Sequence, residues 1–305
     1  MQASGADFRN FDFHIHTNFS SDGVLSPFQV LNALRSRNFS HFSITDHNTV
    51  AGVTDLLKSA GDEGCRKIDF VSGIELSTNF EDVEIHLISY GVDTAHSGLL
   101  ELLSEFEGNR RRQAELRVDK MRSLGFSIDL DRLMEMAQGK TPSGVTFLKA
   151  LAEYPENHDK LEPYLEGERS DSPYTNFYFD YFFRGGRAYV DAPLLDYMKT
   201  VETLRDDSFL CIAHPGQYPE DKPSKLAVEG VRGIEAYSSY HDGEKTDDFL
   251  DLAVRKGMLP VAGSDFHGHR IKPGIHLGGH SCSDADMPLR LMEGVQSTGG
   301  TIFPL

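Results

Sequence analysis

The order of strand-like and helix-like segments is the feature that most constrains the fold of this chain. Short apolar runs of strand length recur from the N-terminus onward, and most are separated by helical patterns. Ser26 followed by Pro27, for example, is a favourable helix start for a helix that we expect to reach about Arg37. A repeated strand–helix order is typical of a parallel sheet or an α/β barrel. The runs expected to form strands are 11–16, 41–45, 69–76, 84–90, 209–213, 233–237 and 258–262.

The middle of the chain has a different pattern. Residues 97–189 contain no convincing strand, and they begin with a long, charged, amphipathic helix pattern over 97–124. We therefore predict a barrel formed by residues 8–96 and 190–305, interrupted by a helical insertion over 97–189 that acts as a cap or substrate-specificity subdomain. The alternative is a series of consecutive helices on the outside of the barrel.

Charge and cysteine content exclude several classes of protein. The chain has 47 acidic and 30 basic residues and a formal net charge of −17, which disfavours binding to duplex DNA and to anionic membranes. Cys65, Cys211 and Cys282 are too widely spaced for a thiolate metal site or a disulfide framework. Residues 1–10 lack the apolar core of a signal peptide, and no apolar run is long enough to span a membrane. We predict a cytoplasmic protein and leave its oligomeric state open.

Histidines and carboxylates gather at the ends of the predicted strands. His14 and His16 are two residues apart on a strand, so both side chains should project from one face. Active sites of parallel α/β folds are assembled where the strands end, so we expect these residues to meet. Asp46 could orient the neighbouring His47 or cap the following helix. The set of ligand-type residues is His14, His16, Asp22, His47, Glu75, His86, His214, Asp265 and His267.

These residue types predict a particular chemistry. Imidazoles and carboxylates without thiolates suit Mn²⁺, Fe²⁺ or Zn²⁺. Nine ligands exceed the need of one ion, so we expect two or three ions with a carboxylate shared between two of them. Such a centre lowers the pKa of bound water and neutralises phosphoryl oxygens, which favours hydrolysis of a phosphate ester.

The same motifs resemble those of the PHP (polymerase and histidinol phosphatase) family. They are His14-Ile15-His16, Asp46-His47, Glu75, His86, Ala213-His214-Pro215 and Asp265-Phe266-His267. The resemblance implies a distorted (β/α)₇ barrel with a trinuclear metal centre. It also implies three ligand sets: His14, His16, Glu75 and Asp265 for the first ion; Glu75, His86 and His214 for the second; and Asp22, His47 and His267 for the third.

Within that family, the chain is most similar to stand-alone phosphoesterases that act on nucleotides. The similarity lies in the insertion and in residues 109–125, 183–190 and 233–241. It implies removal of the 3′-phosphate from a 3′,5′-bisphosphonucleotide or trimming of short oligoribonucleotides from the 5′ end. One difference is that residues 141–145 lack the Arg-Pro-His stretch with which such relatives bind substrate phosphate.

We also predict roles beyond metal binding. A metal-bridging hydroxide would attack phosphorus directly, with Asp265 as a catalytic residue of the centre. His241 is a candidate general acid or phosphate ligand, and its alternative is an exposed loop histidine. Arg187 is a candidate ligand for a second phosphate, and its alternative is a surface ion pair.

Other functions are compatible with parts of this pattern. A histidinol-phosphate-type phosphomonoesterase is the nearest rival, but a small monoester needs no helical cap. A non-catalytic metal-binding accessory domain would be expected to lose ligands, and this chain keeps all nine. A related hydrolase acting on a C–N bond commonly uses a carboxylated lysine or a bridging glutamate, and no lysine stands at a matching strand end.

Overall fold

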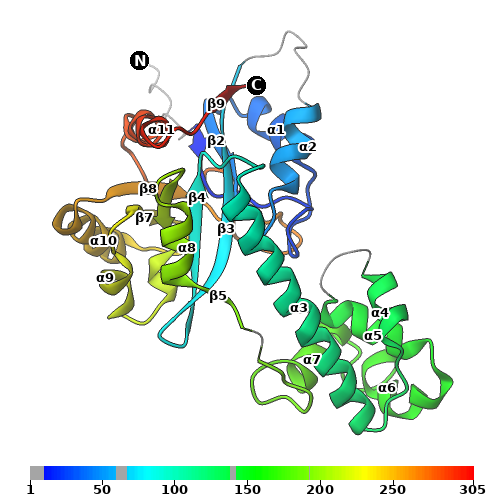
Figure 1. Cartoon of the computed structure of the whole chain (residues 1–305). Coiled ribbons are helices and arrows are strands. Elements are labelled where there is room, and N and C mark those ends of the chain that lie inside the picture. The colour runs from blue at the N-terminus through cyan, green and yellow to red at the C-terminus, as the bar shows by residue number, and fades with distance from the viewer. Residues whose placement is uncertain (1–9, 60–66, 138–141, 192) are drawn as a thin grey trace. The chain divides into compact units, whose positions relative to one another are not determined.

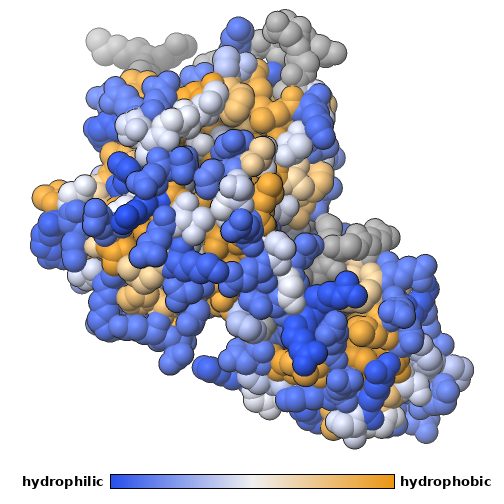
Figure 2. Space-filling view, viewed as in Figure 1, coloured by the Kyte–Doolittle hydropathy of each residue, from blue (hydrophilic) through white to orange (hydrophobic). Residues whose placement is uncertain are grey.

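The computed structural model describes residues 10–59, 67–137, 142–191 and 193–305. The described residues form two compact units, one comprising residues up to 103 together with 194–305 and the other residues 104–193. Helix α3 (Ser97–Ser123) begins in the first unit and continues into the second (Figure 1). Hydrophilic residues cover most of the visible face of each unit (Figure 2).

The first unit is built on one sheet of α/β type. Its strands follow the order β1–β2–β3–β4–β6–β7–β8, and two short strands pair with β3 outside this order. A parallel bridge between Ile15 and Phe266 joins the segments that follow β1 and β8, so the sheet nearly closes. The predicted distorted barrel is thus confirmed. The strands are β1 (Phe11–Asp12), β2 (His41–Ile44), β3 (Asp69–Phe80), β4 (Val83–Tyr90), β5 (Leu195–Asp196), β6 (Phe209–Ile212), β7 (Val231–Ser238), β8 (Leu259–Gly263) and β9 (Ile302–Pro304).

Strand β4 departs from the parallel arrangement that the sequence predicts. It runs antiparallel to both β3 and β6. The reason is the connection: Glu81 and Asp82, both with positive φ, join β3 directly to β4 in a tight hairpin. A parallel neighbour would need a crossover of about a dozen residues or more. The hairpin leaves no room for one (Figure 1).

The first strand is shorter than predicted, because a buried side chain replaces part of its backbone pairing. Of residues 11–16, only Phe11 and Asp12 form regular strand. The Asp12 carboxylate accepts hydrogen bonds from the backbone N–H of His14 (3.2 Å), Ser264 (2.9 Å) and Gly278 (2.8 Å). This one carboxylate therefore fixes the backbone that carries the first histidine pair.

Helices cover the sheet and bury its apolar residues. Helix α1 begins as predicted, with Ser26 and Gln29 forming a reciprocal capping box. Two apolar clusters form the core of this unit, one around Phe42 and Phe70 and the other around Phe13 and Tyr90. The helices of the first unit, besides the start of α3, are α1 (Pro27–Ser36), α2 (Ala51–Ser59), α8 (Tyr197–Leu204), α9 (Lys222–Leu226), α10 (Gly243–Lys256), α11 (Met287–Ser297) and the 3₁₀ turn η2 (Pro215–Gln217).

The second unit is helical and has a core of its own. Buried aromatic residues, including Phe147, Phe177 and Phe182, pack at its centre. The buried Asn157 side chain accepts from the Ser127 N–H (2.8 Å) and donates to the Leu151 carbonyl (2.8 Å). Its elements after α3 are α4 (Leu130–Met136), α5 (Gly144–Ala152), η1 (Pro155–Asn157), α6 (His158–Leu165) and α7 (Pro173–Tyr181). Among the residues described here, every helix is too short or too polar to cross a membrane.

Candidate metal centre

The structure brings the ligand-type residues of the sequence together in one buried cluster of the first unit. Their ligand atoms form three groups, each with all its atoms within 4.8 Å of one another. His214 joins them through its Nε2, which lies 3.0 Å from Glu75 Oε1. The groups are His14, His16, Glu75 and Asp265; His47, Glu75 and His86; and His16, Asp22, His47 and His267.

Glu75 lies at the centre of this cluster and is fully buried. Its Oε2 lies beside one set of ring nitrogens and its Oε1 beside another, so a single carboxylate could be shared between two ions. The five ring nitrogens within 3.0–3.3 Å of its oxygens belong to His14, His16, His47, His86 and His214.

Orphaned polar atoms in the cluster show that its residues fit metal ions. Among the described residues, Glu75 Oε2, His47 Nδ1 and His267 Nε2 are buried without a hydrogen-bond partner. Buried polar atoms are normally satisfied, and a carboxylate oxygen or an imidazole nitrogen is also a metal ligand. Divalent cations would supply the missing partners.

Asp265 and Asp22 complete the two sides of the cluster. Asp265 Oδ1 lies 3.3 Å from His14 Nε2 and 3.2 Å from His16 Nε2, and its backbone has a φ of 58°. Asp22 Oδ2 lies 3.2 Å from His267 Nε2 and 3.6 Å from His47 Nε2. Positive φ is uncommon for a non-glycine residue, and such strain often accompanies functional sites.

Two of the ligand-type residues lie within strands and not at strand ends. Glu75 is in the middle of β3, which continues to Phe80, and His86 lies opposite Ser77 in β4. Because β4 is antiparallel, its N-terminal half lies beside the C-terminal half of β3. His86 therefore reaches the cluster although it is near the start of its own strand.

Without metal, the cluster forms a network of charged groups. Burial disfavours the charged form of His16, but its close contacts with the Asp265 and Glu75 carboxylates outweigh this and raise its pKa to about 9. Burial acts likewise on His86, where Glu75 raises the pKa to about 10. Burial would raise the pKa of Glu75, but the neighbouring histidine charges hold it well below its usual value. Burial lowers the pKa of His47 to about 3.

These shifts predict how the stability of the metal-free protein depends on pH. The stabilisation from His16 and His86 is complete below their ordinary pKa of 6.5 and is lost as the pH rises through about 9 to 10. We expect the Tm of chelator-treated protein to fall between pH 6.5 and 10, and to fall less in His86→Gln. A Tm that stays level or rises over this range in both proteins would contradict the charge network.

Buried neighbours that the sequence analysis did not single out hold the histidines in place. Glu235 Oε1 lies 3.0 Å from His14 Nδ1, and Glu235 Oε2 accepts the backbone N–H of His214 at 2.7 Å. Ser20 Oγ lies 3.2 Å from His16 Nδ1. The sequence signal that could have identified Glu235 is that it is a carboxylate within the apolar stretch 233–237. Partners of this kind fix the orientation of metal-binding histidines.

Asp46 has neither of the two roles considered from the sequence. Its oxygens accept from the Thr17 N–H and the Thr17 hydroxyl, both at 2.6 Å. These bonds fix the backbone directly after His16, because Thr17 is the next residue along the chain. Asp46 therefore supports the first histidine pair and not His47.

A cation lies at one edge of the cluster. Lys272 Nζ is 2.6 Å from Asp265 Oδ2 and 2.8 Å from the Tyr240 hydroxyl. The Tyr240 hydroxyl in turn donates to Asp265 Oδ2 at 2.5 Å. Lys272 retains partial exposure, with 30% of its side chain accessible. The Lys272 ammonium therefore places a positive charge where an anionic substrate could reach it. The overall negative charge of the chain would otherwise repel such a substrate.

His241 is buried and bound to the backbone on both sides. Its Nδ1 lies 2.9 Å from the Ala236 carbonyl, and its Nε2 accepts the Gly216 N–H at 3.1 Å. Burial lowers its pKa. Neither ring nitrogen is free to protonate a leaving group, so the geometry favours a positioning role at the turn that carries His214 over the general-acid role, and His241 is not an exposed loop residue.

A substitution can separate these two roles of His241. We expect His241→Gln to lower kcat less than about 10-fold, with an unchanged pH profile, because loss of a general acid costs about 100- to 10,000-fold. Steady-state rates from pH 5.5 to 9 measure this. A large loss accompanied by removal of one limb of the pH profile would restore the general-acid assignment.

Arg187 lies in the second unit. Its guanidinium carbon is 4.8 Å from the centre of the Tyr181 ring, and the described residues give it no ion pair. Of residues 141–145, Thr141 lies outside the described residues, and Ser143 caps α5 through the Thr146 N–H.

A nearly closed α/β barrel that holds a buried cluster of histidines and carboxylates is typical of metal-dependent hydrolases. The family model of the PHP domain matches residues 12–163. The chain belongs to the PHP domain family, as its motifs predicted.

Relatives of established activity are similar over most of their length. A phosphoribosyl 1,2-cyclic phosphate 1,2-diphosphodiesterase of Eggerthella lenta is 28% identical, covering 84% of this chain and 94% of the relative. The 5′-3′ exoribonuclease Rnm of Escherichia coli is 23% identical, with 88% of each chain covered. A 3′,5′-nucleoside bisphosphate phosphatase of Chromobacterium violaceum is 25% identical, covering 85% of this chain and 87% of the relative.

Solved structures support the fold. A Chromobacterium violaceum protein described as an amidohydrolase with bound sulfate and no metal superposes with a TM-score of 0.69 at 22% identity, covering 94% of this chain and 97% of that one. A metal-dependent phosphoesterase from Bifidobacterium adolescentis, itself described as putative, gives 0.67 at 20% identity, covering 94% and 96%. The enzyme class predicted from the sequence, a metal-dependent phosphoric ester hydrolase, is confirmed.

Proposed function

We propose that this chain hydrolyses a phosphate ester of a small nucleotide, such as a 3′,5′-bisphosphonucleotide, or of a short 5′-phosphorylated oligoribonucleotide. The observation that carries this proposal is the buried Glu75, whose two oxygens contact five imidazoles between the carboxylates of Asp22 and Asp265. The activities named for the three relatives support a nucleotide or sugar phosphate as substrate. We place the protein in the cytoplasm.

The residues present would hold two or three divalent ions, Mn²⁺, Fe²⁺ or Zn²⁺. The geometry supports the three ligand sets that the resemblance implied, and it adds His16 to the third set and His47 to the second. When bound, such ions act as Lewis acids on phosphoryl oxygens and lower the pKa of bound water. Because the ligand histidines bind metal only when neutral, metal binding would displace the protons that the network holds at neutral pH.

The chain's own residues would orient and charge-balance the substrate. The Lys272 ammonium and the Tyr240 hydroxyl both donate to Asp265 Oδ2, so both groups lie beside a residue of the first metal-ligand set. An ammonium at this place attracts a phosphate locally against the net charge of −17. Glu235 and Asp46, both buried, keep the histidine pair and His214 in fixed orientations.

The rival functions make different demands on the chain. A histidinol-phosphate-type monoesterase needs no second unit, and here the second unit is compact, with its own aromatic core. A non-catalytic accessory domain would not need all nine ligand-type residues, and here they converge. Arg187 would contact a second phosphate only if it faces the substrate, which an activity comparison can test.

The test is a hydrolysis assay on Mn²⁺-reconstituted protein that measures free phosphate and also separates the organic products, because cleavage of the RNA would release nucleotides and opening of the cyclic phosphate would leave a monoester. The panel comprises 3′,5′-bisphosphoadenosine, AMP, histidinol phosphate, a ribose 1,2-cyclic phosphate and a short 5′-phosphorylated RNA. The proposal predicts the highest kcat/KM for the bisphosphate or the RNA. A preference for histidinol phosphate or for the cyclic phosphate would show that the proposed substrate is wrong. Absence of hydrolysis of all five compounds would refute the proposed function.

A further inference from the structure

The two carboxylate oxygens of Asp265 face different neighbours. Oδ1 faces the buried cluster, 3.3 Å from His14 Nε2 and 3.2 Å from His16 Nε2. Oδ2 accepts hydrogen bonds from the Lys272 ammonium at 2.6 Å and from the Tyr240 hydroxyl at 2.5 Å. Only 5% of the Asp265 side chain is accessible to solvent, so the protein sets both environments. One oxygen is therefore directed at the metal-ligand residues, and the other is bound by donors of the protein.

The two donors to Oδ2 also hold each other in place. Lys272 Nζ donates to the Tyr240 hydroxyl at 2.8 Å and lies 5.5 Å from the centre of the Tyr240 ring. The Tyr240 ring packs edge-on against the His214 ring, with the two centroids 6.2 Å apart. The backbone N–H of Lys272 donates to the Gly268 carbonyl at 3.0 Å, in a turn that begins with a φ of 96° at this glycine. Both donors are thus fixed beside the same oxygen.

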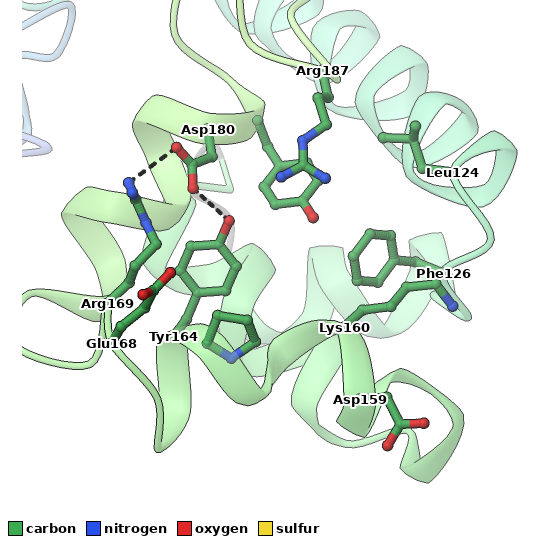
Figure 3. Close-up of a pocket in the computed structure, with 11 residues that line it drawn as sticks. Leu124, Phe126, Asp159, Lys160, Tyr164, Glu168, Arg169, Asp180 and Arg187 are labelled. Carbon is green, nitrogen blue, oxygen red and sulfur yellow. Dashed lines mark hydrogen bonds and ion pairs between the residues drawn. The ribbon is translucent and has the colours of Figure 1, made fainter.

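Cations beside aromatic rings are arranged differently in a pocket of the second unit (Figure 3). There Lys160, Arg169 and Arg187 lie over buried rings, so the protein's own side chains cover these rings. Three acidic residues of the pocket lining balance the three cations. Lys272, in contrast, directs its charge at a residue of the metal-ligand cluster.

The number of oxygens that a carboxylate offers to a metal ion affects what else the ion can bind. A carboxylate can bind through one oxygen or through both. Binding through both fills two ligand positions, whereas catalytic metal sites keep a position for a group from outside the protein. Hydrogen bonds from a charged donor are shorter and stronger than those between neutral groups. The ammonium and the hydroxyl therefore oppose any rotation of Asp265 that would bring Oδ2 to the ion that Oδ1 binds.

We propose that Lys272 and Tyr240 are positioning residues that keep Asp265 a one-oxygen ligand and so reserve a ligand position in the first set for the substrate. The inference rests on the proposed function, because it concerns the same metal-ligand cluster. It adds a role that depends on hydrogen bonds to the attraction of phosphate by the Lys272 charge. The two roles can be separated, because Tyr240 contributes a donor without a charge.

The experiment compares Tyr240→Phe and Lys272→Met with the wild type in full-length protein reconstituted with Co²⁺. We expect kcat for phosphate release from 3′,5′-bisphosphoadenosine to fall about 10- to 100-fold in each variant, with no loss of Co²⁺ affinity. The visible absorption of bound Co²⁺ should change, because the released Oδ2 can join the ligands. Calorimetric titration, absorption spectra and steady-state rates on the same preparations measure these effects. Lys272→Arg keeps a charged donor and should recover most of the activity.

Two matched controls separate this role from general effects of the substitutions. Tyr237→Phe removes a hydroxyl from the same stretch of chain as Tyr240, at a ring that packs against the apolar core of the first unit. Arg270→Met removes an exposed cation from the same loop as Lys272. Both controls should keep the Co²⁺ spectrum and the kcat of the wild type.

The possible outcomes distinguish positioning from the other roles. Co²⁺ affinity that falls in step with kcat in Tyr240→Phe would overturn the proposal, because the donors would then only stabilise the ligand set. A wild-type kcat and spectrum in Tyr240→Phe, with a raised KM in Lys272→Met, would leave only attraction of the substrate and would also overturn it. A changed Co²⁺ spectrum in both variants of a protein that hydrolyses no phosphate ester would support the positioning role and refute the proposed function.

Discussion

Glu75→Gln is expected to lower kcat/KM for phosphate release by about 1,000-fold and to remove most of the bound metal. The substitution keeps the size of the side chain and removes the one charge that all five central imidazoles share. Loss of the shared ligand would remove the stabilisation that bound ions give to the charge of the transition state, which is worth several kcal/mol, and each 1.4 kcal/mol of activation free energy corresponds to about a factor of ten in rate. Metal content per chain and steady-state kinetics on the same sample measure both effects.

Glu81→Gln is the matched control for this substitution. Glu81 is in the same hairpin, at its exposed turn, where it pairs with Lys222. Exposed ion pairs contribute about 1 kcal/mol or less, so activity and metal content should be unchanged. A Glu75→Gln protein that is folded, depleted of metal and still fully active would contradict the role assigned to the cluster.

Glu235→Gln is expected to weaken metal binding by about 10- to 100-fold while leaving a site that excess metal can fill. Glutamine can still accept from the His214 N–H, but it has no charge to hold His14 in its orientation. Activity should therefore return at high Mn²⁺ concentration, whereas Glu75→Gln should stay inactive. Metal titrations monitored by activity distinguish the two responses.

The control for Glu235→Gln is Glu229→Gln, the same change at an exposed position just before β7. It should bind metal as the wild type does. If Glu235→Gln bound metal normally but unfolded at a lower temperature, Glu235 would be a structural residue and its positioning role would be refuted.

The fold was predictable where local pattern decides it. The N-cap at Ser26 and the apolar runs of β2, β6 and β8 are properties of short segments, and each lies within about a residue of its expected place. The antiparallel β4 was not predicted, because its direction depends on the two-residue turn at Glu81–Asp82 and not on the strand itself. The irregular chain after Asp12 depends on bonds to Ser264 and Gly278, far away in the sequence.

The cluster was predictable for a related reason. A histidine or carboxylate in a predicted strand or soon after it is conspicuous, and all nine ligand-type residues selected from the sequence meet in the structure. The surrounding bonds were not predictable, because they join distant segments. Lys272 reaches Asp265 from a loop without regular structure, and the partners of His241 are backbone groups. Contacts of this kind cannot be inferred from the pattern of residue types along the sequence.

The most direct test of the account is a titration of chelator-stripped protein with Mn²⁺, following bound metal and phosphate release from 3′,5′-bisphosphoadenosine in the same samples. The account predicts no activity without metal, then activity that rises with occupancy and saturates at two or three ions per chain. Phosphate release that persists after complete removal of metal would contradict it. Full metal occupancy without hydrolysis of any phosphate ester would contradict it equally.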